Sequence, residues 1–236
     1  MKQSRVKVYG KIIRYHGLFR GVKRVIDQIT QLDLYDIWHS VNFSEIMEGD
    51  EFYSTINPKD RASIMHYQPT YTAAVKAPIK FLANNYQVIG ASSACFLDLG
   101  CGRGKSLHVA RSCLKHFNLL GIDINPILIK DAAQNLGVGE GSYLKAKQVL
   151  IAGNVNDVDY GELLSPYDVI VVFNKNSFDK RTTENTKKLI GDASIGKTLF
   201  YIYNNPVFEN IFAKDTCVFE MRGWHKNWNT KVFIIP

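Results

Sequence analysis

The stretch Phe96-Leu-Asp-Leu-Gly-Cys-Gly-Arg-Gly104 joins a short apolar run to three glycines at alternate positions. The apolar run predicts a buried strand over 95–99, and the residues from Lys105 onward predict a helix. Glycines at this junction let the chain turn tightly and let a ligand approach the main chain. Because α/β sheets bind ligands at the carboxyl ends of their strands, the stretch predicts both an α/β fold and a ligand site.

The sequence downstream alternates apolar runs with helical patterns, as in a doubly wound α/β sheet. Only about eight residues separate the last two apolar runs, too few for a crossover helix, so these two strands are expected to form an antiparallel hairpin. The further predicted strands are 118–123, 148–152, 168–173, 198–203, 217–221 and 230–235, and the predicted helices are 104–116, 126–136 and 180–191.

Polar residues follow the first three predicted strands in the order that an adenosine ligand requires. Asp98 is placed to meet a cationic amino group at the glycine loop. Asp123, at the tip of the second strand, is placed to accept both hydroxyl hydrogens of a ribose. The third strand ends in Gly153-Asn-Val-Asn-Asp157, whose amide and carboxylate groups suit an adenine edge.

Three other interpretations of the loop fit less well. A phosphate-binding loop of the form G-x-x-x-x-G-K-S needs glycine at position 99, which is Leu99 here. A dinucleotide fingerprint needs its third glycine at position 105, which is Lys105. If the glycines are turn residues only, then the three carboxylates at the strand ends are coincidences.

These motifs resemble class I S-adenosylmethionine-dependent methyltransferases, over residues 95–236. The resemblance implies a Rossmann-like doubly wound sheet of seven strands in the order 3-2-1-4-5-7-6, with strand 7 antiparallel. It divides the chain into an N-terminal helical extension and cap, 1–90, and a domain, 91–236, that binds S-adenosylmethionine and releases S-adenosylhomocysteine. The implied cofactor contacts are Asp98, Gly100, Cys101, Gly102, Gly104, Asp123, Ile124, Asn154, Asn156, Asp157 and Asn174.

Two upstream segments resemble the leader of a poorly characterised bacterial subgroup of these enzymes, some of which are associated with surface polysaccharide synthesis. The segments are Tyr35-Asp-Ile-Trp-His-Ser-Val-Asn42 and His66-Tyr-Gln-Pro-Thr70. The resemblance makes Tyr67, Gln68 and Thr70 candidate contacts at the methionine end of the cofactor. The subgroup often has Asn-Pro after the fourth strand; here Asn174 is followed by Lys175, so the substrate-side loop is expected to differ.

Candidate catalytic residues lie at the end of the fourth strand and upstream of the domain. Asn174 is expected to face the transferred methyl group, with Asn176 nearby. His66 is the leading candidate for a general base and His39 the other, although a histidine in such a position more often has a structural role. His225, between Trp224 and Trp228, either lines a sugar-binding surface or belongs to a loop whose tryptophans cover the sheet edge.

The net charge of +7 is concentrated at the N-terminus, where residues 1–29 hold eight Lys or Arg and one acid, Asp27. The spacing of the apolar residues in 11–29 predicts one amphipathic helix, although Gly17 and Gly21 weaken that prediction. Such a helix suits an anionic membrane surface, a phosphate backbone, or packing on the domain or a second subunit. The apolar stripe consists of Ile12, Tyr15, Phe19, Val22, Ile26 and Ile29.

The leading functional hypothesis is O-methylation of a sugar, a polysaccharide precursor or another small molecule. A protein or nucleic-acid methyltransferase and a non-catalytic adenosine-binding module are the alternatives, and nucleic acid is disfavoured because no Asn/Asp-Pro-Pro-Tyr/Phe motif follows the fourth strand. With no signal peptide or spanning segment in the sequence, the expected location is the cytoplasm, with peripheral association at the inner face of the membrane as an option. No metal site is predicted, four scattered cysteines are expected to be reduced, and the sequence does not specify an oligomer.

Overall fold

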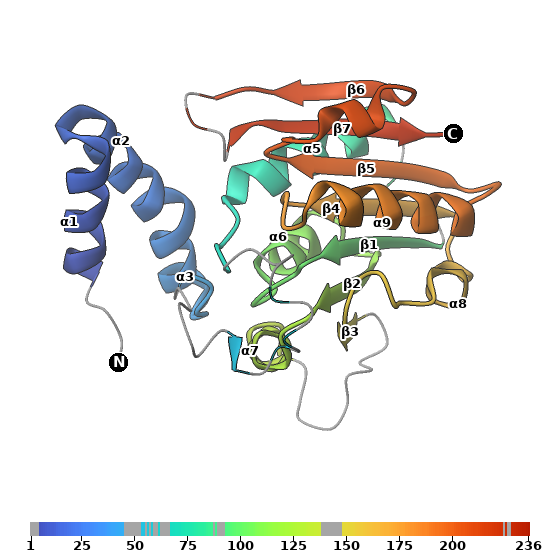
Figure 1. Cartoon of the computed structure of the whole chain (residues 1–236), viewed down its shortest axis with the longest axis horizontal. Helices are drawn as coiled ribbons and strands as arrows, with labels where there is room; N and C mark the ends of the chain where they lie inside the picture. The colour runs from blue at the N-terminus through green and yellow to red at the C-terminus, as the bar shows by residue number, and fades with distance from the viewer. Residues whose placement is uncertain are drawn as a thin grey trace.

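The computed structural model describes residues 5–44, 53, 54, 56, 58, 61, 67–86, 88, 93–137, 148–223, 225 and 228–236. These residues form a sheet of seven strands in the order β3-β2-β1-β4-β5-β7-β6, in which β7 runs antiparallel to both of its neighbours. The predicted fold class, strand order and terminal hairpin are therefore confirmed (Figure 1). The strands are β1 (Ala94–Leu99), β2 (Asn118–Asp123), β3 (Gln148–Ala152), β4 (Val169–Asn174), β5 (Thr198–Asn204), β6 (Thr216–Met221) and β7 (Thr230–Ile235).

Helices cover both faces of the sheet, which explains why the central strands are almost uniformly apolar. One face packs against α5 (Thr72–Asn85), α6 (Lys105–Cys113) and α7 (Pro126–Asn135), and the other against α8 (Tyr160–Leu164) and α9 (Lys180–Ala193). Every residue of β1 is buried, and the core is correspondingly divided into two apolar clusters. The sheet is therefore a rigid platform for whatever lies at its edge.

The predicted helices are confirmed within a few residues, and their start points follow from local hydrogen bonding. Asn125 accepts hydrogen bonds from the amides of Ile127 and Leu128 at the start of α7, at 2.9 and 3.4 Å. Asp179 likewise accepts from Thr182 at the start of α9, at 2.7 Å. Short polar side chains at this position satisfy amides that have no partner within the helix. The one-turn helix α8 and the 3₁₀ turn Glu209–Phe212 have no clear periodic signal and were not predicted.

The prediction of one continuous helix over 11–29 is wrong. The chain forms α1 (Arg5–His16) and α2 (Leu18–Gln28), separated by Gly17 at a φ of 76°. The two helices cross closely, because a Cβ atom on Gly21 would lie 2.5 Å from the Cα atom of Ile13. Gly17 therefore interrupts the predicted helix by allowing the turn, while Gly21, inside α2, allows the close crossing of the two helices.

The helical segment continues from α2 through a π turn (Ile29–Asp33) into α3 (Leu34–His39), and the π turn is its attachment point. The main-chain oxygen of Gln31 accepts hydrogen bonds from Thr72, at the start of α5, and from Lys105, at the start of α6. Further along the chain, the indole of Trp228 donates to Asp27 of α2 at 3.0 Å. Figure 1 shows α1 and α2 beyond the carboxyl ends of the parallel strands.

Helix α5 belongs to the core of the sheet, since Val75, Ile79 and Leu82 are buried with residues of α6 and β1. The division of the chain at residue 90 stays a prediction. Most of the segment 48–62, predicted as a loop, lies outside the described residues. Among the described helices, none has the length and apolar character needed to cross a bilayer.

Candidate functional site

The glycine loop lies where four strand ends meet. Leu99, the last residue of β1, pairs with Ile122 of β2 on one side and with Asn174 of β4 on the other, and Asp123 pairs with Ala152 of β3. Gly100, Gly102 and Gly104 have φ values of 74°, 53° and 84°, in the left-handed region that favours glycine. The amides of Gly100 and Cys101 both donate to the main-chain oxygen of Ile122, at 2.8 and 2.9 Å. The loop is thereby held against the end of β2.

Asp123 connects the tip of β2 to this loop. One of its carboxylate oxygens accepts from the amide of Gly102 at 2.8 Å, and the other accepts from the amide of Asn125 at 2.9 Å. The side chain is buried, and burial raises its pKa to about 6. A carboxylate oxygen has two acceptor positions, so each oxygen keeps capacity for one further hydrogen bond. The orientation of Asp123 is therefore set before any ligand binds.

Asp98 lies beneath the loop rather than on its surface. It is 2 % exposed, its carboxylate accepts from the hydroxyl of Ser106 in α6, and burial raises its pKa to about 7. Ser106, near the start of α6, was not singled out in the sequence. Two carboxyl groups beside one loop favour a cationic ligand with hydroxyl donors over a polyphosphate.

The cationic side chains around the loop contact other parts of the chain. Arg103 forms an ion pair with Asp131 at 3.3 Å, and Lys175 donates to the main-chain oxygens of Gln68 and Pro69 at 2.6 and 2.9 Å. Lys105 donates to Gln31, and burial lowers its pKa to about 7. The lysine that made this loop resemble a phosphate-binding loop is thus engaged in attaching the N-terminal segment.

The predicted segment 67–70 lies across the glycine loop. A Cβ atom on Gly102 would lie 2.2 Å from the ring of Tyr67, so the ring rests directly on the main chain there. The Tyr67 hydroxyl donates to Phe43 at 2.8 Å, while Thr70 is buried and Gln68 is exposed. The segment therefore spans from the glycine loop to Lys175, directly after β4. His66 lies outside the described residues.

A small apolar cluster lies beside Asp123, and only some of its residues were predicted as contacts. Ile124 was predicted as a contact, and it packs with Tyr67 and Leu128. Tyr53 and Ile56 complete the cluster with Ile127. The sequence indicated Tyr53 and Ile56 only weakly, because they are isolated apolar residues in a polar stretch that has no periodicity. The cluster provides an apolar surface next to the tip of β2.

The residues after β3 form a turn held by its own side chains. Asn154 accepts from the amide of Asn156 at 3.0 Å, and Asn156 in turn accepts from the side-chain amide of Asn185 in α9 at 2.9 Å. Asp157 donates its main-chain amide to Asn154, and its side chain is exposed. Of the three, Asp157 has the side chain most accessible to a ligand.

Asn174 is fully buried and bonded within the protein. Its side-chain oxygen accepts from the amides of Asn176 and Ser177, at 2.9 and 3.4 Å, and its side-chain nitrogen donates to the hydroxyl of Tyr201 at 3.0 Å. These bonds shape the turn that carries Ser177, whose side chain lies 3.2 Å from where a Cβ atom of Gly100 would be. The geometry gives Asn174 a positioning role, and its expected contact with a methyl group stays a prediction.

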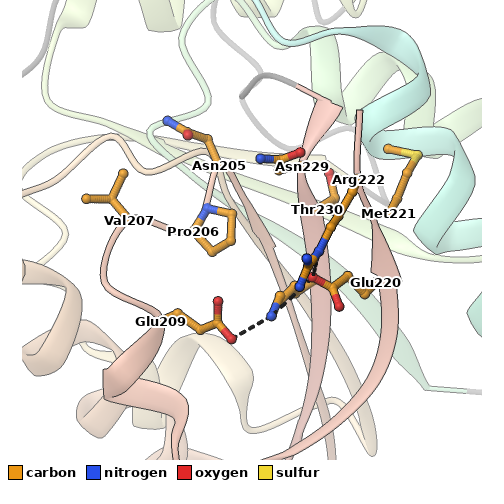
Figure 2. Close-up of a pocket in the computed structure, with 10 residues that line it drawn as sticks. Asn205, Pro206, Val207, Glu209, Glu220, Met221, Arg222, Asn229 and Thr230 are labelled. Atoms are coloured by element: carbon orange, nitrogen blue, oxygen red, sulfur yellow. Dashed lines mark hydrogen bonds and ion pairs between the residues drawn. The ribbon is translucent and has the colours of Figure 1, made fainter. Parts of the chain in front are cut away.

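A pocket of about 280 Å³ opens near the ends of β5 and β6 and the start of β7. Pro206 and Val207 lie on one side of it, and Arg222 and Thr230 lie on the other (Figure 2). An ion pair of 2.5 Å between Glu209 and Lys231 borders the pocket. Asn205, directly after β5, lines the pocket beside Pro206.

Trp228, one of the hairpin residues considered for sugar binding, does not line this pocket. Trp228 donates to Asp27 and packs edge-on against Tyr71, with ring centroids 5.7 Å apart. These contacts hold α2 against the domain, which favours the structural interpretation of this tryptophan. Trp224 lies outside the described residues.

The chain is similar to several solved structures at low sequence identity. No protein-family model and no curated protein matches the sequence. The methyltransferase domain of bacterial CtHen1 is 14 % identical with a TM-score of 0.48, over 66 % of this chain and 97 % of that one. CalS10, an amino pentose methyltransferase from Micromonospora echinaspora, is 11 % identical with a TM-score of 0.47, over 69 % and 92 %. A TehB-like methyltransferase from Corynebacterium glutamicum is 15 % identical with a TM-score of 0.42, over 67 % and 97 %. Resemblance this remote concerns the arrangement of the chain alone.

Proposed function

We propose that the chain binds S-adenosylmethionine and acts as a methyltransferase. The observation that carries the proposal is the bond between Asp123 and the amide of Gly102, which places a buried carboxylate beside the glycine loop. The two groups suit the ribose diol and the methionine end of one ligand. Asp98 beneath the same loop adds negative charge where the ligand carries a sulfonium and an ammonium group.

The residues present fit this cofactor in three places. Asp123 has acceptor capacity for the ribose hydroxyls, and we place the methionine end along the loop from Gly100 to Gly104, next to Tyr67, Gln68 and Thr70. The apolar cluster around Ile124 suits the faces of an adenine ring. Asn154, Asn156 and Asp157, after β3, suit its polar edge. Cys101 is buried within the loop and would contribute its main chain.

The contribution of the protein to methyl transfer is mainly positional. When bound, S-adenosylmethionine supplies a methyl group on a cationic sulfur, and S-adenosylhomocysteine remains after transfer. The loop and Asp123 hold the ligand against the sheet, while Asn174 keeps the turn after β4 in one conformation. Alignment of acceptor, carbon and sulfur within about 3 Å then accounts for much of the rate. The roles of His66 and His39 as general bases stay predictions.

We propose a sugar, a polysaccharide precursor or another small polar molecule as the acceptor. The pocket between Pro206 and Arg222 supports this, because its size suits a small molecule and its walls carry both charged and amide groups. A protein or nucleic-acid acceptor is the alternative, favoured only by the basic N-terminal helices. Detection of labelled methyl groups in glycan, protein and RNA fractions of a cell extract separates the two.

Titration calorimetry tests directly whether the chain binds S-adenosylmethionine. We expect S-adenosylmethionine and S-adenosylhomocysteine to bind one site per chain, and ATP and NAD not to bind, because the two carboxyl groups disfavour phosphate. Binding of ATP in preference to S-adenosylmethionine would contradict the proposal. Binding without methyl transfer to any cell fraction would instead support a non-catalytic adenosine-binding module.

The pKa shifts predict that cofactor affinity increases with pH. Burial raises the pKa of Asp98 to about 7 and that of Asp123 to about 6, from an ordinary value of 3.8. Because the folded-state pKa values are raised, these groups contribute stability that is present below the ordinary pKa and lost as pH rises through the folded values. Ligand binding needs the charged forms, so we expect affinity to rise between about pH 5 and 8 and protons to be released on binding.

Calorimetry in buffers of different ionisation enthalpy measures this proton release. The increase in melting temperature caused by the cofactor should likewise grow over the same pH range. An affinity that is constant across it would mean that neither carboxyl group changes its protonation on binding.

The remaining predictions on location and partners are proposals. We propose that the protein works in the cytoplasm, at the inner face of the membrane when residues 11–29 engage it. The resemblance of 35–42 and 66–70 to a polysaccharide-associated subgroup supports a glycan acceptor and nothing narrower.

A further inference from the structure

The N-terminal helices expose an unusual number of large apolar side chains. Of the eleven such residues among the described part of the chain, eight lie between positions 15 and 38. Phe19 is 90 % exposed, Trp38 86 % and Tyr15 85 %. Scattered exposed apolar residues are normal, but a concentration of this kind marks an interaction surface. The other five are Leu18, Val22, Ile26, Leu34 and Ile37.

These residues lie opposite the face that attaches the helices to the domain. Leu18, Val22 and Ile26 follow one another at spacings of four residues along α2, which places them on one face of the helix. Leu34 and Trp38 continue that spacing in α3 beyond the π turn. The side chain of Asp27 points the other way, to Trp228, and that of Gln31 accepts from the amide of Ala73 in α5. The apolar residues are therefore not part of the attachment.

Charge is segregated across the same helices. Between positions 9 and 44 the sequence has three acids, and all of them are buried: Asp27 is 8 % exposed, Asp33 4 % and Asp36 2 %. Asp27 accepts from Trp228, Asp33 from Tyr9, and Asp36 from the amides of Phe43 and Ser44. The exposed charged side chains in this range are all basic, namely Lys11, Arg14, Arg20 and Lys23.

We propose that this surface, the eight apolar residues together with Lys11, Arg14, Arg20 and Lys23, binds an anionic lipid bilayer. A bilayer surface satisfies both halves of the pattern, because lipid headgroups pair with the bases while the apolar side chains enter the acyl boundary. Tyrosine and tryptophan, with an apolar body and a polar tip, favour that boundary.

Other partners satisfy only half of the pattern. A second copy of this chain docking face to face would bring four bases against four bases of the same sign. A nucleic acid would pair with the bases and leave most of the apolar side chains exposed to water. Of these three partners, the bilayer suits both the charge and the apolar surface.

The proposal does not depend on the methyltransferase assignment. Because α1 and α2 lie beyond the carboxyl ends of the strands, a bilayer on their outer surface is on the same side of the molecule as the glycine loop (Figure 1). Calorimetry with S-adenosylmethionine is carried out without vesicles, so failure of one proposal leaves the other measurable.

Vesicle flotation of the full chain tests the proposal. The probes are phosphatidylcholine vesicles with and without phosphatidylglycerol, at low and high salt. We expect binding only with phosphatidylglycerol, weakened by salt, as for other basic amphipathic surfaces. Phe19→Ser with Trp38→Ser, and separately Arg14→Glu with Lys23→Glu, should each reduce vesicle partitioning by about tenfold or more. All four side chains are exposed, so the fold should be retained.

Matched control variants carry the same chemical changes elsewhere. Ile195→Ser removes another apolar side chain that is 81 % exposed, and Arg181→Glu with Lys188→Glu reverses two exposed charges on α9. Both should bind vesicles as the unaltered chain does. Equal losses in the control variants, or no vesicle binding at all, would overturn the proposal.

Two specific outcomes assign the surface to another partner, and both also overturn the proposal. One is a dimer, detected by light scattering, that Phe19→Ser with Trp38→Ser dissociates while vesicles remain unbound. The other is RNA binding that requires Arg14 and Lys23, again without vesicle binding.

Discussion

Replacing Asp123 by alanine is expected to lower the affinity for S-adenosylmethionine by at least about 100-fold. Hydrogen bonds to a charged group are each worth about 1.5–3 kcal/mol, and the proposal assigns two of them to the ribose diol. The same change removes the acceptor of the Gly102 and Asn125 amides. The loop then loses the contact that holds it against β2, so a loss of about 2 kcal/mol or more in the free energy of unfolding is expected as well.

Two measurements separate the binding effect from the folding effect. Circular dichroism reports whether Asp123→Ala is folded, and calorimetry on the folded fraction reports affinity. Asp192→Ala, an exposed carboxylate in α9, is the control and should bind the cofactor normally. If Asp123→Ala is folded and binds within about threefold of the unaltered chain, the ribose contact has been placed wrongly.

Gly102→Ala is expected to abolish detectable cofactor binding. The new Cβ atom would lie 2.2 Å from the ring of Tyr67, and the φ of 53° disfavours any side chain by about 1–2 kcal/mol. Either the ring of Tyr67 or the loop must move, and both belong to the proposed site. Calorimetry should show at least about a 100-fold loss of affinity, since a displacement of about 1 Å at a preorganised site is enough to disrupt it.

Gly137→Ala is the matched control for backbone strain. Gly137 has a φ of 66°, close to that of Gly102, but a Cβ atom there meets nothing within 4 Å. It should lose about the same stability from strain while keeping its cofactor affinity. A second variant, Gly102→Ala with Tyr67→Ala, removes the clash and should recover part of the folding stability. Equal losses of affinity in Gly102→Ala and Gly137→Ala would mean that contact with Tyr67 is irrelevant to the site.

Local patterns in the chain were enough to predict the sheet. Each strand is a short apolar run bounded by turn residues, and the ranges predicted for β1, β2 and β3 agree with the structure to within one residue. The hairpin of β6 and β7 followed from the length of its connection. The glycine loop and the acid at the tip of β2 were equally visible, because both are local features of the sequence at strand ends, where α/β sheets bind ligands.

The details that give each side chain its role depended on contacts between distant segments. Asn174 was expected to face a ligand, but its side chain is buried and bonds to Tyr201 and to the amides after β4. Tyr67 covers Gly102 from 35 positions away, and neither residue carries a signal of the other. Hydrogen-bond partners of this kind are set by how the layers pack, which periodicity does not specify.

The N-terminal helices show the same difference between what local sequence patterns predict and what long-range contacts decide. Their basic and apolar composition was visible in the sequence, but the burial of all three acids was not. Asp27, for example, accepts a hydrogen bond from Trp228, 201 positions away. Hydrophobic spacing and turn chemistry act over a few residues, so the order of residues alone specified the strands, the loop and the charge at this end. The approach of segments far apart in the chain decides which charges remain exposed and which carboxylate oxygen holds the loop. Only folding brings these segments together.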